Sequence, residues 1–289
     1  MTLNHPLRGR TRLLSVALTA TALGAFAFTA SGAGAAGSSI AVPAPPAAPT
    51  KANQIQNIDQ VKTAIKGYYG DTVTAQLDPV SGTVALHQFN PNGSYANEMG
   101  GIVAQAERYL KFWNPSHVST KAVLFDIDDT TLNTYSYEIY SNFVFNPTTN
   151  AAFVNACLTA TGCVFPAVPH MVELEQYAEA QGYTVFFLTG RPQNATSNQR
   201  PGTLANLTHA GYDVTDANVY LKDASGATQP WLSSCAPACT TTQYKSLTRQ
   251  HIQSLGYKII ANFGDQFSDL NGGFAQKGFK VPNPMYFLP

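Results

Sequence analysis

Three carboxylates crowd into four positions directly after the short apolar stretch Ala122–Phe125: Asp126, Asp128 and Asp129. Only 12% of the residues are charged, so this crowding stands out in the chain. Neighbouring carboxylates repel one another unless a cation, a proton or hydrogen-bond donors compensate their charge. A strand-to-helix turn with capping aspartates is the alternative interpretation, and the letters DDT alone fit both. Residues elsewhere in the chain are needed to distinguish a cation-binding site from a simple turn.

Asp126, Asp128 and the distant Asp265 are candidate ligands of a divalent cation. Magnesium prefers oxygen ligands, usually one or two carboxylates together with water and a substrate phosphate. In an extended segment residues two apart share a side, so Asp126 and Asp128 are expected to face one ligand while Asp129 points elsewhere. These residue types therefore predict a magnesium site.

A phosphate group has its own candidate ligands in Thr189-Gly190-Arg191 and Lys245. A hydroxyl, a glycine N–H that permits close approach and a cation all suit phosphate oxygens. By itself the tripeptide also fits a turn before Pro192, and an isolated lysine near the start of a helix is ordinarily solvated. These residues become informative only together with the aspartates.

The elements that must position these residues alternate along the second half of the chain. The expected strands are Ala122–Phe125, Thr184–Leu188, Asn218–Leu221 and Lys258–Phe263, and the expected helices are Val168–Gln181, Gln199–His209 and Thr241–Leu255. Gly182, Gly211 and Gly256 each follow a helix, as a C-terminal cap does. Apolar strands that alternate with helices predict an α/β fold with a parallel sheet covered on both faces.

Ligands of such a sheet bind beyond the carboxyl ends of its strands. Asp126 follows the first expected strand, Thr189 the second and Asp265 the fourth, so these residues are expected to converge at one edge. Two further helices, about Gln54–Tyr68 and Tyr95–Phe112, are expected before them, with either a β-hairpin or an irregular excursion around Asp78–Gly82.

The four motifs in this order resemble those of the haloacid dehalogenase (HAD) superfamily of phosphotransferases. DIDDT is similar to its first motif, FLTGR to its second, Lys245 to its third and GDQFSD to its fourth. The strings YKSLTRQHIQSLGYKIIANFGDQFSDL and FKVPNPMYF are similar to the exported acid phosphatases of subfamily IIIB. The resemblance covers about Ala122–Pro289, and it implies a Rossmann-like, three-layer parallel sheet with a small cap insertion at about 133–183.

The resemblance also implies roles for the motif residues. Asp126 is the expected nucleophile, and Asp128 the expected general acid and then base. Mg²⁺ is expected on Asp126, on the backbone carbonyl of Asp128 and on Asp265. Thr189, Gly190 and Lys245 are expected to bind the phosphoryl oxygens, and Asp269 to orient the metal ligands or Lys245. Arg191 either assists them or pairs with a carboxylate behind the site.

Aromatic residues crowd the start of the insertion: Tyr135, Tyr137, Tyr140, Phe143 and Phe145. They either receive the leaving group or pack a core, and the sequence does not decide between the two.

The N-terminal segment resembles an export signal. Arg8, Arg10 and Arg12 precede an apolar stretch and a small-residue run, so residues 1–35 are expected to be a signal peptide and the mature protein to be secreted. An Ala/Pro-rich linker is expected at 36–52, before a catalytic domain at 53–289.

Export predicts disulfides for the four cysteines, most simply Cys157–Cys163 and Cys235–Cys239, with a zinc site as the alternative. The net charge is zero, with 17 basic and 17 acidic residues, which disfavours a nucleic-acid or anionic-membrane partner. No stable membrane insertion is expected after signal cleavage, and the oligomeric state stays open.

The sequence thus predicts a secreted, magnesium-dependent acid phosphatase that forms an aspartyl-phosphate. The alternatives are a phosphotransferase of the same fold, which passes the phosphoryl group to an acceptor alcohol, and a non-catalytic storage or binding protein on this scaffold. The presence of Asp126 favours an enzyme.

Overall fold

The computed structural model describes residues 40–114, 120–194 and 196–288. The expected signal peptide at 1–35 and the first residues of the expected linker lie outside this range. Residues 41–50 are exposed, and 41–51 contain no helix or strand; the short 3₁₀ helix η1 (Ala52–Gln54) follows them.

A parallel sheet in the order β6-β4-β3-β7-β8 lies at the centre of the fold. Its strands are β3 (Lys121–Phe125), β4 (Thr184–Asn194), β6 (Val219–Lys222), β7 (Lys258–Gly264) and β8 (Lys277–Lys280). The end of β4 also pairs antiparallel with the two-residue strand β5 (Ser197–Asn198).

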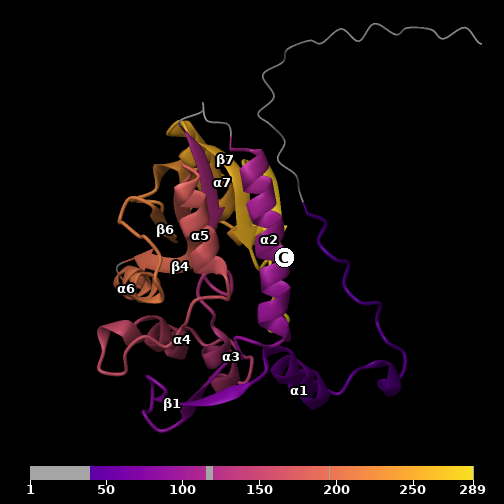
Figure 1. The fold of residues 1–289 in the computed structure, drawn as a ribbon. Helices are drawn as coiled ribbons and strands as arrows, with labels where there is room; N and C mark the ends of the chain where they lie inside the picture. The colour runs from indigo at the N-terminus through magenta and orange to yellow at the C-terminus, as the bar shows by residue number, and fades with distance from the viewer. Residues whose placement is uncertain (1–39, 115–119, 195, 289) are drawn as a thin grey trace, which may run out of the picture. The chain divides into compact units, whose positions relative to one another are not determined.

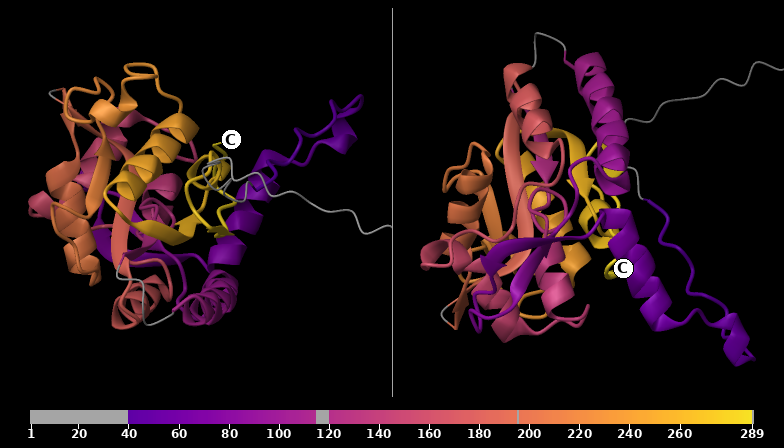
Figure 2. Two further views of the ribbon diagram at one scale, coloured as in Figure 1. Left: turned by 90° about the horizontal axis from the view of Figure 1, so that it is seen from above. Right: turned by 60° about the horizontal axis from the view of Figure 1, so that its bottom comes forward.

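Helices cover both faces of this sheet (Figures 1 and 2). Val123 and Phe125 of β3 belong to one core cluster, together with buried apolar side chains of α2 (Ser94–Phe112) and α5 (Met171–Ala180). Ala122 and Leu124 belong to the other cluster, together with buried apolar side chains of α7 (Thr241–Ser254). The remaining helix of the alternating half is α6 (Arg200–Ala210). The alternation of side chains along each strand therefore builds the predicted three-layer α/β fold.

The expected elements are confirmed to within a few residues, and so are their C-terminal signals. Gly182, Gly211 and Gly256 all have positive φ (80°, 102° and 97°), which a residue without a Cβ adopts at little cost. α7 begins with a capping box, in which the Thr240 hydroxyl accepts from the Gln243 N–H.

Two strands of the parallel sheet differ from expectation. β4 continues past Leu188 to Asn194, with an irregularity in its pairing to β6 between Leu188 and Pro192. Thr189, Gly190 and Arg191 therefore lie in an irregular stretch of the strand rather than after it. The sequence does not predict β8, because "KGFK" has only one strongly apolar residue. This segment forms a strand through its pairing with β7.

A group of smaller elements lies beyond the end of the sheet to which β7 points (Figure 1). The hairpin is present as β1 (Thr72–Leu77) and β2 (Ala85–Gln88), after helix α1 (Ile58–Tyr69). The range 133–183 contains α3 (Tyr135–Tyr140), α4 (Pro147–Val154) and η2 (Ala156–Leu158), and also α5, which packs on β4.

The disulfide Cys157–Cys163 lies in this range, and the hairpin contacts it directly. The Gln76 Nε2 donates to the Thr161 and Cys163 carbonyls at 2.9 and 3.1 Å. The second predicted disulfide, Cys235–Cys239, is also present, in the loop after η3 (Pro230–Leu232). All four cysteines are thus oxidised, and the zinc alternative is wrong because no thiolate remains for a metal.

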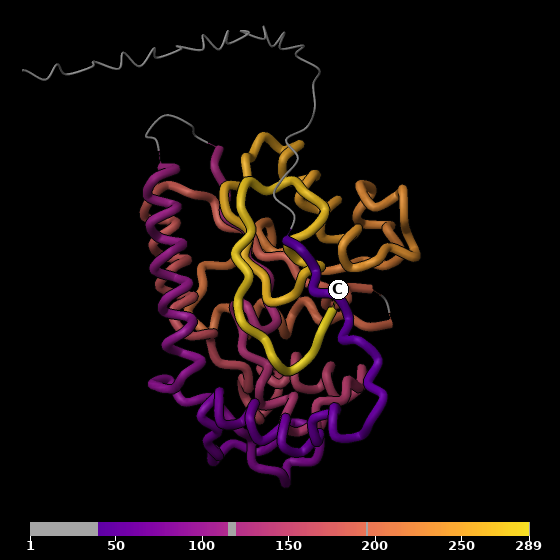
Figure 3. Tube along the Cα trace, turned by 90° about the vertical axis from the view of Figure 1, so that its right-hand side faces the viewer, coloured from indigo at the N-terminus to yellow at the C-terminus, as the bar shows by residue number. Residues whose placement is uncertain are grey.

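The last described residues, 281–288, form a tail that leaves β8 and turns back beside the end of β7 (Figure 3). The last helix, α8 (Phe267–Leu270), follows β7. Among the described residues, no helix has the length and apolar character needed to cross a membrane.

Candidate active site

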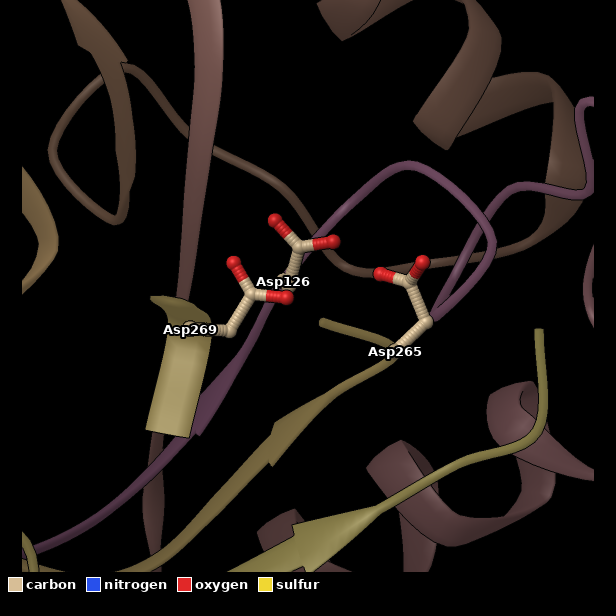
Figure 4. Close-up of side chains that lie close together, drawn as sticks. All are labelled: Asp126, Asp265 and Asp269. Carbon is tan, nitrogen blue, oxygen red and sulfur yellow. The ribbon is translucent and has the colours of Figure 1, made fainter. Parts of the chain in front are cut away.

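Three buried carboxylates meet at the carboxyl edge of the sheet (Figure 4). Asp126 directly follows β3, Asp265 directly follows β7, and Asp269 lies in α8. Each offers an oxygen within 4.8 Å of an oxygen from the other two, and each is at most 7% exposed. β3 and β7 are neighbours in the sheet, which is why residues 139 positions apart in the sequence converge here.

Lys245 of α7 provides the positive charge nearest to this cluster. Its Nζ contacts Asp126 Oδ1, lies 3.0 Å from Asp269 Oδ1 and donates to the Leu188 carbonyl at 2.6 Å. Burial opposes the charge of this ammonium, but the two carboxylates more than compensate and raise the pKa of Lys245 above its ordinary value. The two carboxylates therefore favour the charged form of Lys245.

One lysine does not neutralise three carboxylates. Burial first, and then repulsion from Asp269, raise the pKa of Asp126 well above its ordinary value and that of Asp265 to about 8. A divalent cation between the two carboxylates removes this cost, because it stabilises their ionised forms. The donor set consists of oxygen atoms alone, so it fits a hard cation such as magnesium.

Asp128 points away from the cluster, toward β4. Its carboxylate accepts from Arg191 Nε at 3.1 and 3.0 Å and from Arg191 Nη2 at 2.7 Å, and the Thr189 hydroxyl donates to it at 3.2 Å. Arg191 in turn donates through Nη1 to the Thr203 hydroxyl at 3.0 Å. The structure shows Arg191 paired with a carboxylate, but with that of Asp128, the expected general acid, and not with one behind the site.

Asp129 anchors the loop after β3. It has a φ of 54°, in the left-handed region that aspartate tolerates better than most residues. Its carboxylate accepts from the Thr134 N–H at 2.9 Å, the Thr134 hydroxyl at 2.5 Å and the Tyr286 hydroxyl at 2.8 Å. Asp129 therefore stabilises the turn, whereas Asp126 lies in the carboxylate cluster and Asp128 pairs with Arg191 of β4.

Two glycines of the motifs have opposite surroundings. A Cβ at Gly264 would lie 2.4 Å from Asp269 Cβ, so only glycine allows α8 to fold Asp269 back over the end of β7. A Cβ at Gly190 would meet no atom within 4 Å, and the residue is exposed. The space beside Gly190 is therefore open to a ligand rather than filled by the protein.

Sequence reasoning missed three residues that hold this site together. Arg249 is fully buried and donates to the carbonyls of Asp269, Asn271 and Gly273 around the end of α8. Its spacing of four from Lys245, on one face of one helix, was the available signal. Asn283 and Tyr286 of the tail reach Asp265 and Asp129. Both lie in the string FKVPNPMYF, whose similarity to the family was the available signal, but that string does not indicate which residues they contact.

The expected aromatic residues of the insertion divide into two groups. Tyr135 and Tyr137 are fully buried in the main core, where the Tyr137 ring packs edge-on against Phe153. Tyr140 and Phe143 are half-buried, and Phe145 is 70% exposed. Tyr140 and Phe143 pack against the same core cluster, so core packing accounts for all of these aromatic residues except Phe145.

Comparison with solved structures supports the fold. The class C acid phosphatase from Bacillus anthracis superposes with a TM-score of 0.53 at 20% identity, over 68% of this chain and 80% of that chain. The sequence model of the acid phosphatase family, HAD superfamily, subfamily IIIB, matches residues 84–289. The chain belongs to this family. As a subfamily IIIB acid phosphatase, it is a phosphomonoester hydrolase that acts on a small-molecule phosphate.

Its curated relatives include plant proteins. Acid phosphatase 1 of Solanum lycopersicum is 29% identical over 196 residues, 67% of this chain and 69% of that protein. The stem 28 kDa glycoprotein of Glycine max is 31% identical over 57% of this chain and 59% of its own length, and vegetative storage protein 2 of Arabidopsis thaliana is 27% identical over 68% and 67%. This acid phosphatase spans less than two thirds of the soybean protein.

Proposed function

We propose that this acid phosphatase hydrolyses phosphomonoesters with the help of Mg²⁺ and through an aspartyl-phosphate on Asp126. The observation that carries the proposal is the buried cluster of Asp126, Asp265 and Asp269 at the carboxyl edge of the sheet, with Lys245 and the open space at Gly190 beside it. This edge is where α/β sheets bind their ligands.

Mg²⁺ would be held by the carboxylates of Asp126 and Asp265 and by the backbone carbonyl of Asp128. When bound, the cation offsets the negative charge of the carboxylates and of the phosphate that approaches them. Asp269 stays with Lys245, at 3.0 Å, and accepts from the Gln266 N–H at 2.9 Å. Asp269 then positions the lysine and the loop instead of holding the metal itself.

In the first step, an Asp126 oxygen attacks phosphorus and the ester bond breaks. The leaving alkoxide takes a proton from the protonated form of Asp128, which lies beside Thr189 and is 29% exposed and so accessible to substrate. In the second step, Asp128 accepts a proton from water, which attacks the phosphorus and releases phosphate and free Asp126. The Thr189 hydroxyl, the Gly190 N–H and the Lys245 ammonium hold the phosphoryl oxygens through both steps.

The Arg191–Asp128 pair fixes the direction of the ionised Asp128 carboxylate, the form that acts as the base in the second step. Two guanidinium nitrogens hold the carboxylate, and the Thr203 hydroxyl holds the guanidinium from behind. This bidentate geometry fixes the carboxylate more firmly than a single contact does.

A panel of phosphomonoesters tests the proposal: nucleotides, sugar phosphates and an aryl phosphate, assayed before and after chelation and after return of Mg²⁺. We expect chelation to abolish hydrolysis and Mg²⁺ to restore it better than Ca²⁺, whose larger and looser shell fits this site poorly. Full activity after exhaustive chelation contradicts the metal assignment. Adding an acceptor alcohol separates hydrolysis from transfer, because a transferase yields more phosphorylated acceptor than free phosphate.

We further infer that the protein is exported. The two disulfides support an oxidising compartment, in which such bonds persist. N-terminal sequencing of the protein recovered outside the cell tests this inference: a mature chain that begins close to Ala36 is expected. A protein that stays inside the cell with residues 1–35 attached contradicts it.

A further inference from the structure

The C-terminal tail contacts the carboxylate site directly. The Asn283 Nδ2 donates to Asp265 Oδ2 at 2.7 Å, and the Tyr286 hydroxyl donates to Asp129 Oδ2 at 2.8 Å. A third contact fixes the end of the tail, where the Leu288 N–H donates to Gln266 Oε1 at 2.7 Å. These contacts join the last residues of the chain to both aspartate motifs.

The two oxygens of Asp265 have different partners. Oδ2 receives two amide donors, Asn283 Nδ2 at 2.7 Å and Gln266 Nε2 at 2.6 Å. Oδ1 has a single long contact, at 3.4 Å, with the Thr130 hydroxyl. Two donors on one oxygen fix the rotation of the carboxylate and leave the other oxygen available to a cation.

The tail is built to hold Asn283 in one position. Pro282 and Pro284 flank it, and a proline fixes its own φ and restricts the residue before it to extended conformations. The Asn283 Oδ1 accepts from the Met285 N–H at 2.8 Å, and the Val281 N–H donates to the Gly264 carbonyl at 3.0 Å, directly before Asp265. The amide therefore meets Asp265 with little conformational freedom left to lose.

We propose that Asn283 is a positioning residue for the metal site, which it serves by orienting Asp265. This inference rests on the proposed binding of Mg²⁺ at Asp126 and Asp265. Groups that hydrogen-bond to a metal-ligating carboxylate fix its orientation, and their loss typically weakens metal affinity by about 10–100-fold. Asn283 acts through Asp265 and does not itself touch the substrate.

The test compares Asn283→Ala with Asn218→Ala by calorimetric titration with Mg²⁺. Asn218 is a matched control, because it is also half-buried and its amide makes the same kinds of hydrogen bond. Its Oδ1 accepts from the Thr215 N–H at 2.7 Å, and its Nδ2 donates to the Asp213 carbonyl at 3.2 Å. Unlike Asn283, it lies at the amino end of β6, away from the carboxyl edge of the sheet. We expect Asn283→Ala to raise the Mg²⁺ dissociation constant by about 10–100-fold and Asn218→Ala to leave it unchanged. Excess Mg²⁺ should restore turnover in Asn283→Ala without a change in KM.

Asn283→Ser provides a second variant if Asn283→Ala fails to fold, because a serine hydroxyl can still accept from the Met285 N–H. A folded Asn283 variant whose Mg²⁺ dissociation constant stays within about twofold of wild type, short of the 10–100-fold expected, overturns the inference while the proposed function stands. A wild-type protein that binds no Mg²⁺ overturns the proposed function, and the role of Asn283 falls with it. The two failures are thus distinguishable.

Discussion

At the scale of single residues, Asp126 and Asp128 have different partners and should fail differently when changed to asparagine. Asp126→Asn should abolish turnover with every ester, because an amide is a far poorer nucleophile. Asp128→Asn should slow alkyl phosphates by about 10²–10⁴-fold, the usual worth of general acid–base help. A nitrophenyl phosphate should suffer less in its first step, because its leaving anion needs no proton.

Single-turnover release of the alcohol or phenol measures this difference. Equal losses for both esters in Asp128→Asn would contradict its role as the acid, and retained turnover in Asp126→Asn would contradict the covalent mechanism. Circular dichroism controls for the fold.

The two motif glycines provide a matched pair of alanine substitutions. Gly190→Ala should fold with unchanged thermal stability, since its Cβ meets no protein atom, but should raise KM and lower kcat by up to about 10²-fold by displacing the phosphate. Gly264→Ala should impair the kinetics and also lower the melting temperature, because its Cβ would collide with Asp269. Thermal melts and steady-state kinetics on both variants check this, and a Gly190→Ala protein with normal kinetics would place the phosphate elsewhere.

At the scale of elements, Glu175 couples the packing of α5 to pH. It is fully buried, its Oε1 accepts from the Asp213 N–H at 3.3 Å and its Oε2 has no partner among the described residues. Burial first, and repulsion from Glu179 next, raise the pKa of Glu175 from 4.5 to about 7. The folded protein thus binds this proton more tightly than the unfolded chain does, so stability falls as pH rises from about 4.5 through about 7.

Glu175→Gln should therefore melt like wild type at pH 4 and at a higher temperature than wild type at pH 8. The melting temperature should rise by roughly 2–4 °C for each kcal/mol that the ionised, buried Glu175 costs the folded state. Melting curves across this pH range measure the effect, with the exposed Glu173 of the same helix changed to Gln as the control. A constant difference at all pH values would rule out the titration of Glu175 as the cause.

At the scale of the whole molecule, Mg²⁺ should stabilise the fold because it binds the folded state alone. At a concentration 100 times its dissociation constant, the gain is about 2.7 kcal/mol, or about 5–10 °C in melting temperature. Asp265→Asn should reduce this shift, whereas Asp216→Asn, which changes an exposed carboxylate paired with Arg200, should keep it. A melting temperature that does not respond to Mg²⁺ in wild type would contradict binding at this cluster.

The sequence by itself determined the alternation of the main strands and helices from β3 to β7. The apolar residues of β3, β4 and β7 and the glycine after each helix are local signals. It also indicated the residues that converge: the carboxyl ends of parallel strands share an edge, so Asp126, Thr189 and Asp265 follow from their positions after apolar runs. Local pairing of the cysteines needed only their short spacing.

Only the tertiary structure decided the contacts that depend on distant segments. The pairing of Arg191 with Asp128 follows from the side-by-side register of β3 and β4, and the position of Asn283 on Asp265 follows from the pairing of β8 with β7. β8 itself is short and nearly without apolar residues, so its order comes from its neighbour rather than from its own composition. Such contacts carry no local pattern, because their free energy arises between segments that only the folded chain brings together.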